Sequence, residues 1–216
     1  MIALQRLAEP VVLTENGERW LNRLLEHPGQ RPDPRQYGHR EIRNALRAMS
    51  FHKCFYCERK LSEAEDRVDH YIEFTEAPER AFVWVNLYLS CDNCNGQKTP
   101  NLRIPVEQCL NPCDNSIDPV EHLTFDNEVI RPRFGSPMGE QTIRKYSLDR
   151  QQLNYLRSKQ LQRFERFIRE LLEARIRGNR PFTQAEREAI ASFGQADHEF
   201  SLMFQTYLAF AVSGME

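Results

Sequence analysis

Cys54-Phe-Tyr-Cys57 and Cys91-Asp-Asn-Cys94 are two C-x-x-C motifs that decide how this chain folds. The 33 residues between them include the segment Val68-Asp69-His70-Tyr71. Four thiolates at this spacing are typical of one tetrahedral zinc ion, and a site with four sulfur ligands leaves no open position for a substrate. We therefore expect the four cysteines to hold a structural zinc ion. The residues between the motifs are the candidates for chemistry.

The composition is that of an ordinary globular protein. The chain has 216 residues, of which 40% are apolar and 28% are charged, and this is enough for one domain or two small ones. It contains no apolar run near the ~20 residues that span a bilayer, and its first residues do not form a signal-peptide pattern. We therefore expect a cytoplasmic protein without a membrane partner.

Cysteines in a cytoplasmic chain indicate metal ligands before disulfides. Four of the six cysteines belong to the C-x-x-C motifs. The other two, Cys109 and Cys113, lack the spacing of a zinc motif, and the chain offers no second pair to complete a site. We interpret them as free thiols in a turn-rich segment, with a redox or metal role as the alternative.

Charge is distributed unevenly along the chain, although the net charge is only −2. Residues 61–128 hold fourteen acidic and four basic side chains, whereas residues 141–180 hold eleven basic and four acidic ones. Such asymmetry can separate a catalytic part from a part that binds nucleic acid. The alternative is a solvated helix face that is rich in arginine.

The order of the predicted elements indicates an α+β fold in three parts. Residues 1–50 are predicted to be helical, residues 51–140 to form a zinc-bound core with a following loop and hairpin, and residues 141–216 to be helical. Further expected elements are helices over about Thr14–Leu25 and Gly38–Met49, strands over Arg67–Ile72 and Ala81–Leu89, a short helix over Asp92–Thr99, a hairpin near Leu123–Pro132, a long helix ending at Gly178-Asn179, a helix opened by the capping box Thr183-Gln-Ala-Glu186, and an apolar stretch over Phe200–Phe210.

The residues between the motifs suit the hydrolysis of a phosphodiester, which needs an activated water and a cation on the leaving oxygen. His70 suits the first task, because an imidazole with an ordinary pKa of about 6.5 can take a proton from water near neutral pH. Asp69 precedes His70 on the predicted strand, so the two side chains point to opposite sides of the backbone. One can face a metal ion while the other faces water.

Oxygen ligands for a metal ion, an orienting amide and a lysine complete this candidate site. Asp69 and Asn95 offer hard oxygen ligands for Mg²⁺ or Mn²⁺, and Mg²⁺ needs only one or two ligands from the protein. Asn86 is the candidate for orienting the loop that holds His70, through hydrogen bonds from its amide to backbone. Lys98, one helical turn after Asn95, is the candidate for binding a substrate phosphate.

Each of these features has a simpler interpretation when it is taken alone. An Asp-His pair is common at surfaces and helix caps, and paired C-x-x-C motifs occur in zinc ribbons that bind rather than cut. The combination within one zinc frame favours a metal-dependent nuclease. The alternative is a zinc-stabilised adaptor subunit that binds nucleic acid or protein without catalysis.

The combined pattern resembles a known family. C-x-x-C…V-D-H…N-L-x-L-S-C-x-x-C-N-x-x-K is similar to the HNH endonucleases, in which His70 matches the first histidine, Asn86 the asparagine and Asn95 the last position. Many relatives carry histidine at that last position. The resemblance implies a zinc-stabilised ββα-metal core, flanked here by N-terminal and C-terminal helices, and the hydrolysis of nucleic acid. We expect the substrate to be DNA, with RNA as the alternative.

Further stretches resemble a narrower group, the PtuB-like HNH proteins of Septu and retron anti-phage defence systems. The matching stretches are K-C-x-Y-C-E over Lys53–Glu58, L-N-P-C-D over Leu110–Asp114, Pro119-x-x-His122, Phe125-Asp126, Thr142-Ile143 and Leu148-Asp149-Arg150. This resemblance implies an ATPase partner of the PtuA type. His122 is interpreted as a structural histidine, with a supporting role at the site as the alternative.

Overall fold

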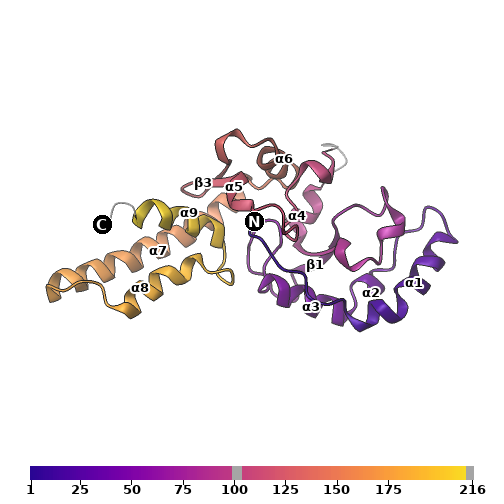
Figure 1. Ribbon diagram of the computed structural model, residues 1–216, viewed down its shortest axis with the longest axis horizontal. Helices are drawn as coiled ribbons and strands as arrows, with labels where there is room; N and C mark the ends of the chain where they lie inside the picture. Colours follow the sequence, from indigo (N-terminus) through magenta and orange to yellow (C-terminus); the bar gives the residue numbers. More distant parts are fainter. Residues whose placement is uncertain (99–103, 213–216) are drawn as a thin grey trace.

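The computed structural model describes residues 1–98 and 104–212, and it combines helices with two small antiparallel sheets, as the α+β prediction requires (Figure 1). The helices are α1 Val11–Leu25, α2 Pro34–Tyr37, α3 Arg40–Ser50, α4 Asp92–Gln97, α5 Pro119–His122, α6 Pro137–Tyr146, α7 Gln151–Gly178, α8 Gln184–Ala191 and α9 Ser201–Val212, and the strands are β1 Asp66–His70, β2 Leu87–Cys91, β3 Leu123–Asp126 and β4 Val129–Pro132.

A ββα unit forms the centre of the molecule. Strand β1 pairs with β2 in antiparallel register, from Asp66 opposite Cys91 to His70 opposite Leu87. Strand β2 continues directly into α4, because the Sγ atom of Cys91 accepts the backbone N–H of Cys94 at 3.4 Å and caps the helix. The predicted cap was Asp92. The predicted end of this helix, at Thr99, lies outside the described residues.

The return strand is shorter than predicted. The apolar stretch Ala81–Leu89 was expected to be extended, but Trp84–Asn86 forms a 3-10 turn and the strand begins only at Leu87. The turn arises because the Asn86 side chain bonds to backbone across the loop, accepting from Ile72 N–H and donating to the carbonyls of Ile72 and Arg80. A polar side chain therefore interrupts what the apolar pattern alone would extend.

The N-terminal helices also begin at residues other than those predicted. Helix α1 begins at Val11 after Pro10, and the Thr14 hydroxyl donates to the Val11 carbonyl instead of capping the helix. The expected helix over Gly38–Met49 is present as α3, which begins at Arg40, and the short helix α2, which was not predicted, ends just before Gly38. A Cβ at that position would lie 2.5 Å from the Pro34 carbonyl oxygen, so the close turn requires glycine.

The C-terminal helices follow the predicted pattern closely. Helix α7 ends where Asn179 adopts a left-handed conformation, and the capping box of Thr183 and Glu186 opens α8. The predicted hairpin is present as β3 and β4. In Figure 1, α7 and α8 extend away from the ββα unit, and α1 and α2 lie at the opposite end of the molecule.

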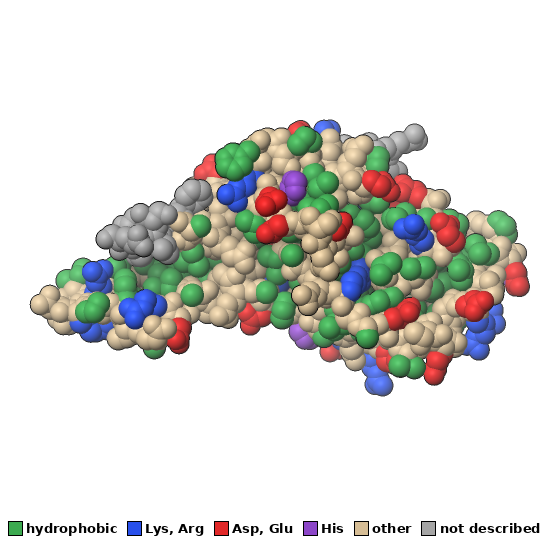
Figure 2. Space-filling view, viewed as in Figure 1, with side chains coloured by type: hydrophobic (Ala, Val, Ile, Leu, Met, Phe, Trp, Pro, Cys, Tyr) green, Lys and Arg blue, Asp and Glu red, His purple; other side chains and the backbone are tan. Residues whose placement is uncertain are grey.

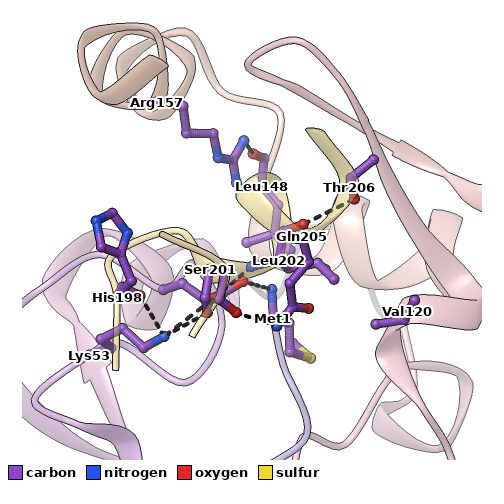
Figure 3. Close-up of polar contacts among 12 residues, drawn as sticks. Met1, Lys53, Val120, Leu148, Arg157, His198, Ser201, Leu202, Gln205 and Thr206 are labelled. Carbon is purple, nitrogen blue, oxygen red and sulfur yellow. Dashed lines mark hydrogen bonds and ion pairs between the residues drawn. The ribbon is translucent and has the colours of Figure 1, made fainter. Parts of the chain in front are cut away.

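Buried polar groups join the first C-x-x-C motif to the start of α9. Glu58 accepts hydrogen bonds from the Ser201 hydroxyl at 2.5 Å and from the Leu202 backbone N–H at 3.2 Å. Lys53 donates to Ser201 Oγ and to the His198 carbonyl, both at 2.9 Å. Figure 3 shows Lys53, His198 and Ser201 converging at this point. The carboxylate of Glu58 thus satisfies backbone donors at the N-terminus of α9.

One hydrophobic core contains side chains from all three predicted parts of the chain. It includes Leu46 from α3, Leu89 from β2 and Phe204 from α9. Phe200 and Met203 of the predicted C-terminal apolar stretch are buried in it as well, whereas the side chain of Phe210 is outside the described part. The proposed division into three parts stays a prediction. None of the helices within residues 1–98 and 104–212 has the length and hydrophobicity to span a bilayer.

Candidate active site and metal centre

The four cysteines of the C-x-x-C motifs form one buried cluster. Their Sγ atoms all lie within 4.8 Å of one another. Backbone hydrogen bonds fix the first motif, because Cys54 N–H donates to the Arg59 carbonyl and Phe55 N–H to Leu89 on β2. Four sulfur donors in a closed, buried cluster fit a structural zinc ion, which these residues would hold without contributing an open coordination position.

A basic side chain from the C-terminal part lies against this cluster. Arg150 Nη2 is 3.6 Å from Cys94 Sγ. Metal binding requires deprotonated thiols, so a four-cysteine zinc site carries net negative charge that a guanidinium stabilises. The side chain of Arg157 is also buried nearby, donating to the Leu148 carbonyl at 2.8 Å, as Figure 3 shows for these two residues. The predicted metal cluster is therefore supported by residues that the motif does not contain.

His70 lies at the end of β1 in the protonation state that a general base needs. Its Nε2 is 2.9 Å from the Ala81 carbonyl oxygen. A carbonyl can only accept, so the hydrogen of neutral His70 resides on Nε2 and its Nδ1 has a free lone pair. Burial lowers the pKa of His70 below its usual 6.5, although the Ala81 carbonyl and the Asp69 charge act in the opposite direction. The imidazole is therefore neutral at pH 7.

Asp69 connects the metal cluster to the candidate site. Tyr56, between the two cysteines of the first motif, donates to Asp69 Oδ2 at 2.5 Å. Lys98 Nζ lies 3.0 and 3.1 Å from the two carboxylate oxygens of Asp69, and it also donates to the His70 carbonyl. The ammonium of Lys98, predicted to bind substrate phosphate, thus contacts the carboxylate. Its phosphate role stays a prediction.

Asn86 stabilises the loop that joins the two strands and that begins directly after His70. Its side-chain amide accepts from Ile72 N–H at 2.8 Å and donates to the carbonyls of Ile72 and Arg80 at 3.0 and 3.1 Å. Its own carbonyl accepts from Tyr71 N–H at 2.8 Å. All four bonds join residues that follow β1 to residues that precede β2. Substituting Asn86 would release this loop on the side next to His70.

A cavity of about 240 Å³ brings the predicted residues together. Its walls include Asp69 and His70 from β1, Asn95 from α4, and Lys98 directly after α4. Asn86 does not line this cavity. Carboxylate and amide oxygens in one cavity fit a hard divalent cation. A carboxylate has about four lone-pair positions; Tyr56 and Lys98 use three of those on Asp69, and the remaining position on Oδ1 fits ligation through one oxygen.

Part of the cavity wall comes from residues outside the two motifs that were not predicted from the sequence. Tyr37 of α2 packs edge-on against the His70 ring with 4.7 Å between ring centroids, and the Phe74 ring lies 6.2 Å from it. Arg31 and Glu73 also line the cavity. No local motif marks Arg31 or Tyr37, because the tertiary fold alone brings α2 and the segment before it over β1.

Three further residues of the sequence analysis lie away from this cavity. Cys109 is buried with its Sγ atom 3.6 Å from the Pro105 carbonyl, and Cys113 is half-buried. His122 ends α5, and its Nδ1 is 2.8 Å from Ser136 Oγ. Within the described residues, none of the three joins the four-cysteine cluster. Their placement agrees with structural roles.

Comparison with known proteins bears on this arrangement directly. Residues 54–101 match the HNH endonuclease family. The HNH segment contains all four clustered cysteines and all five predicted site residues. Within this match, β1, β2 and α4 supply the ββα unit, so the resemblance expected from the sequence is confirmed.

Two curated proteins extend the similarity beyond the HNH segment. A Septu protein PtuB from Bacillus mycoides (strain KBAB4) is 29% identical over 199 residues, which cover 74% of this chain and 66% of the relative. A Septu protein PtuB from Bacillus thuringiensis is 29% identical over 133 residues, which cover 61% of this chain and 49% of the relative. The chain thus spans slightly less than two thirds of the first relative and about half of the second.

Proposed function

We propose that this protein is a metal-dependent HNH endonuclease that hydrolyses phosphodiester bonds of nucleic acid. The observation that carries the proposal is the geometry of His70, whose Nε2–H is held by the Ala81 carbonyl while its ring lines the same cavity as Asp69 and Asn95. A neutral imidazole in this tautomer is suited to accept a proton at Nδ1 from an attacking water. The HNH family match supports the same chemistry.

The other side chains have distinct tasks in this proposal. Asp69 and Asn95 would hold a divalent ion, Mg²⁺ or Mn²⁺, which when bound supplies positive charge to the leaving oxygen. Tyr56 and Lys98 fix the Asp69 carboxylate. Asn86 holds the loop next to His70 in one position. This matters because a general base has to be held within about 0.5 Å of its productive position.

We further propose that the nuclease is the effector subunit of an anti-phage defence complex with an ATPase of the PtuA type. The similarity to two proteins named Septu protein PtuB supports this role. The acidic composition of residues 61–128 is consistent with dependence on a partner, since an acidic surface repels a polyanionic substrate. A retron context is a further proposal, as is DNA as the substrate, with RNA as the alternative.

A cleavage assay tests the proposed activity. The purified chain, alone and co-purified with the ATPase from its own gene neighbourhood, is incubated with supercoiled DNA and with RNA in Mg²⁺, Mn²⁺ or a chelator. We expect cleavage that requires the divalent ion in at least one of the two preparations. Binding without cleavage in both preparations would contradict the proposal and favour the alternative, a zinc-stabilised adaptor subunit.

A further inference from the structure

The cavity beside His70 has two basic side chains in its described wall, Arg31 and Lys98. A nuclease needs positive charge next to the phosphate that it cuts. The side chain of Lys98 is only 3% exposed, and its ammonium contacts both oxygens of Asp69 and the His70 carbonyl. Lys98 therefore stabilises the carboxylate, and its three donors are already used within the protein.

Arg31 is in the opposite situation. It is exposed, and no carboxylate of the described residues forms an ion pair with it. Its guanidinium lies 5.8 Å from the centroid of the Phe74 ring, close enough for a cation–π contact that limits its orientations. Phe74 in turn packs against the His70 ring. The side chain is thus held at the cavity with its hydrogen-bond donors available.

We propose that Arg31 binds a phosphate of the nucleic-acid strand next to the bond that His70 acts on. This inference rests on the proposed nuclease function and gives its site a substrate-binding residue that comes from outside the HNH segment. A guanidinium can donate two parallel hydrogen bonds to phosphate oxygens, which an ammonium cannot do in the same geometry. The ligand is therefore a phosphodiester backbone, of DNA or RNA.

The position of the arginine-rich helix strengthens the case for Arg31. Helix α7 carries most of the exposed arginines of the C-terminal part, but α7 and α2 extend toward opposite ends of the molecule (Figure 1). Among the described residues on the face drawn in Figure 2, Lys and Arg side chains are scattered between acidic ones and form no continuous basic surface. Charge on α7 can bind distant parts of a long substrate, whereas a contact at the reacting phosphate requires a residue of the cavity wall.

The test measures nucleic-acid binding as a function of salt concentration. The full chain, in its ATPase complex if the complex is the active form, carries His70→Ala so that the probe stays intact. Fluorescent DNA duplexes and RNA strands serve as separate probes. Arg31→Gln is compared with Arg35→Gln, a matched control that removes the same charge from an exposed arginine on α2 outside the cavity wall.

We expect Arg31→Gln to weaken binding of at least one probe about tenfold and to reduce the salt slope on duplex DNA by about one. Arg31→Met, which keeps an aliphatic side chain without the charge, should lose as much, and Arg31→Lys should restore part of it. Arg35→Gln should change affinity by less than half as much. Equal effects at Arg31 and Arg35, or an unchanged salt slope with Arg31→Met, would overturn the inference.

The outcomes separate this inference from the proposed function. If the protein with an intact His70 cleaves but Arg31→Gln cleaves and binds equally well, the nuclease stands and the role of Arg31 fails. If the intact protein binds without ever cleaving, the nuclease proposal fails, and the salt slope still decides whether Arg31 contacts phosphate. If the intact protein neither binds nor cleaves, both are refuted.

Discussion

At the scale of single residues, the Asp69 carboxylate belongs both to the fold and to the site. It accepts from Tyr56 in the metal-binding motif and from Lys98 after α4, and its side chain is 6% exposed. A buried carboxylate has to be paired to remain ionised at low cost. The divalent ion proposed at Asp69 would bind beside an ammonium, and the repulsion between the two cations would lower metal affinity.

Lys98→Met tests this arrangement. We expect the free energy of unfolding to fall by about 3 kcal/mol in a chelator, because the Asp69 carboxylate loses its buried partner. Part of the loss should return when Mg²⁺ or Mn²⁺ is added, since the ion then neutralises the same carboxylate. Urea denaturation with and without metal measures both effects. Lys159→Met removes an exposed ammonium on α7 and should change neither; equal curves for the two variants would contradict the pairing.

The lowered pKa of His70 predicts the pH dependence of cleavage. Burial disfavours the charged imidazolium, so the neutral base is present at pH 7 and is lost only when the pH falls through a pKa below 6.5. The single-turnover rate constant should therefore decline toward low pH with a midpoint under 6.5. A midpoint at or above that value would show that His70 is not held as the structure indicates.

Some of these residues could be recognised in the sequence, and others could not. The cysteines, Asp69, His70 and Asn95 stand in short motifs whose spacing is itself the signal. Arg31 and Tyr37 enter the cavity through tertiary packing, and the sequence contains no periodicity that connects α2 with β1. The Lys98–Asp69 contact has the same origin, because a lysine near a catalytic motif indicates a phosphate ligand as readily as an internal ion pair.

At the scale of elements, the contact between the first C-x-x-C motif and α9 fixes the C-terminal part to the core. Burial opposes ionisation of Glu58 most strongly, but the charges of the Met1 amino group and Lys53 outweigh it and lower the pKa of Glu58 to about 2. The carboxylate is therefore charged at neutral pH and caps α9 through Ser201 and Leu202.

Glu58→Gln should loosen α9 without removing the metal site. The substitution keeps the shape of the side chain but leaves the Lys53 ammonium, which is 2% exposed, without its charged partner. We expect a loss of about 3 kcal/mol in unfolding free energy, with faster amide hydrogen exchange in α9 and unchanged zinc content. Glu65→Gln breaks the more exposed pair with Arg59 and should cost less than about 1 kcal/mol. Unchanged exchange in α9 would refute the capping role.

The elements that the sequence predicted well are those with local end signals. Asn179 after Gly178 ends α7, and the capping box at Thr183 opens α8, because both signals act through neighbouring backbone groups. The prediction of a strand over Ala81–Leu89 was wrong for its first half, and the strand begins only at Leu87. Ala81, Phe82 and Trp84 are buried in a looped backbone that Asn86 holds through its bonds to Ile72 and Arg80. Apolar content alone cannot distinguish such a loop from a strand.

At the scale of the whole molecule, the candidate site and the arginine-rich helix are separated. The cavity lies between α2, β1 and α4, whereas α7 begins beside α4, where Gln152 accepts from Asn93 at 3.2 Å, and extends toward the opposite end of the molecule (Figure 1). The charge asymmetry seen in the sequence therefore corresponds to a separation in space. A long nucleic acid, or a partner that lies across both ends, could contact α7 and the cavity together. The sequence alone could not predict this separation, since it gives no orientation for α7.

We propose His70 as the general base of a nuclease whose four-cysteine cluster only holds the site in place. The most direct measurement compares single-turnover cleavage by the intact protein, His70→Ala and His122→Ala, with zinc content and unfolding midpoint measured on the same samples. The account predicts that His70→Ala keeps its zinc and its fold but loses at least about a hundredfold in rate, while His122→Ala, outside the cavity, cleaves normally. Full cleavage by His70→Ala would contradict it.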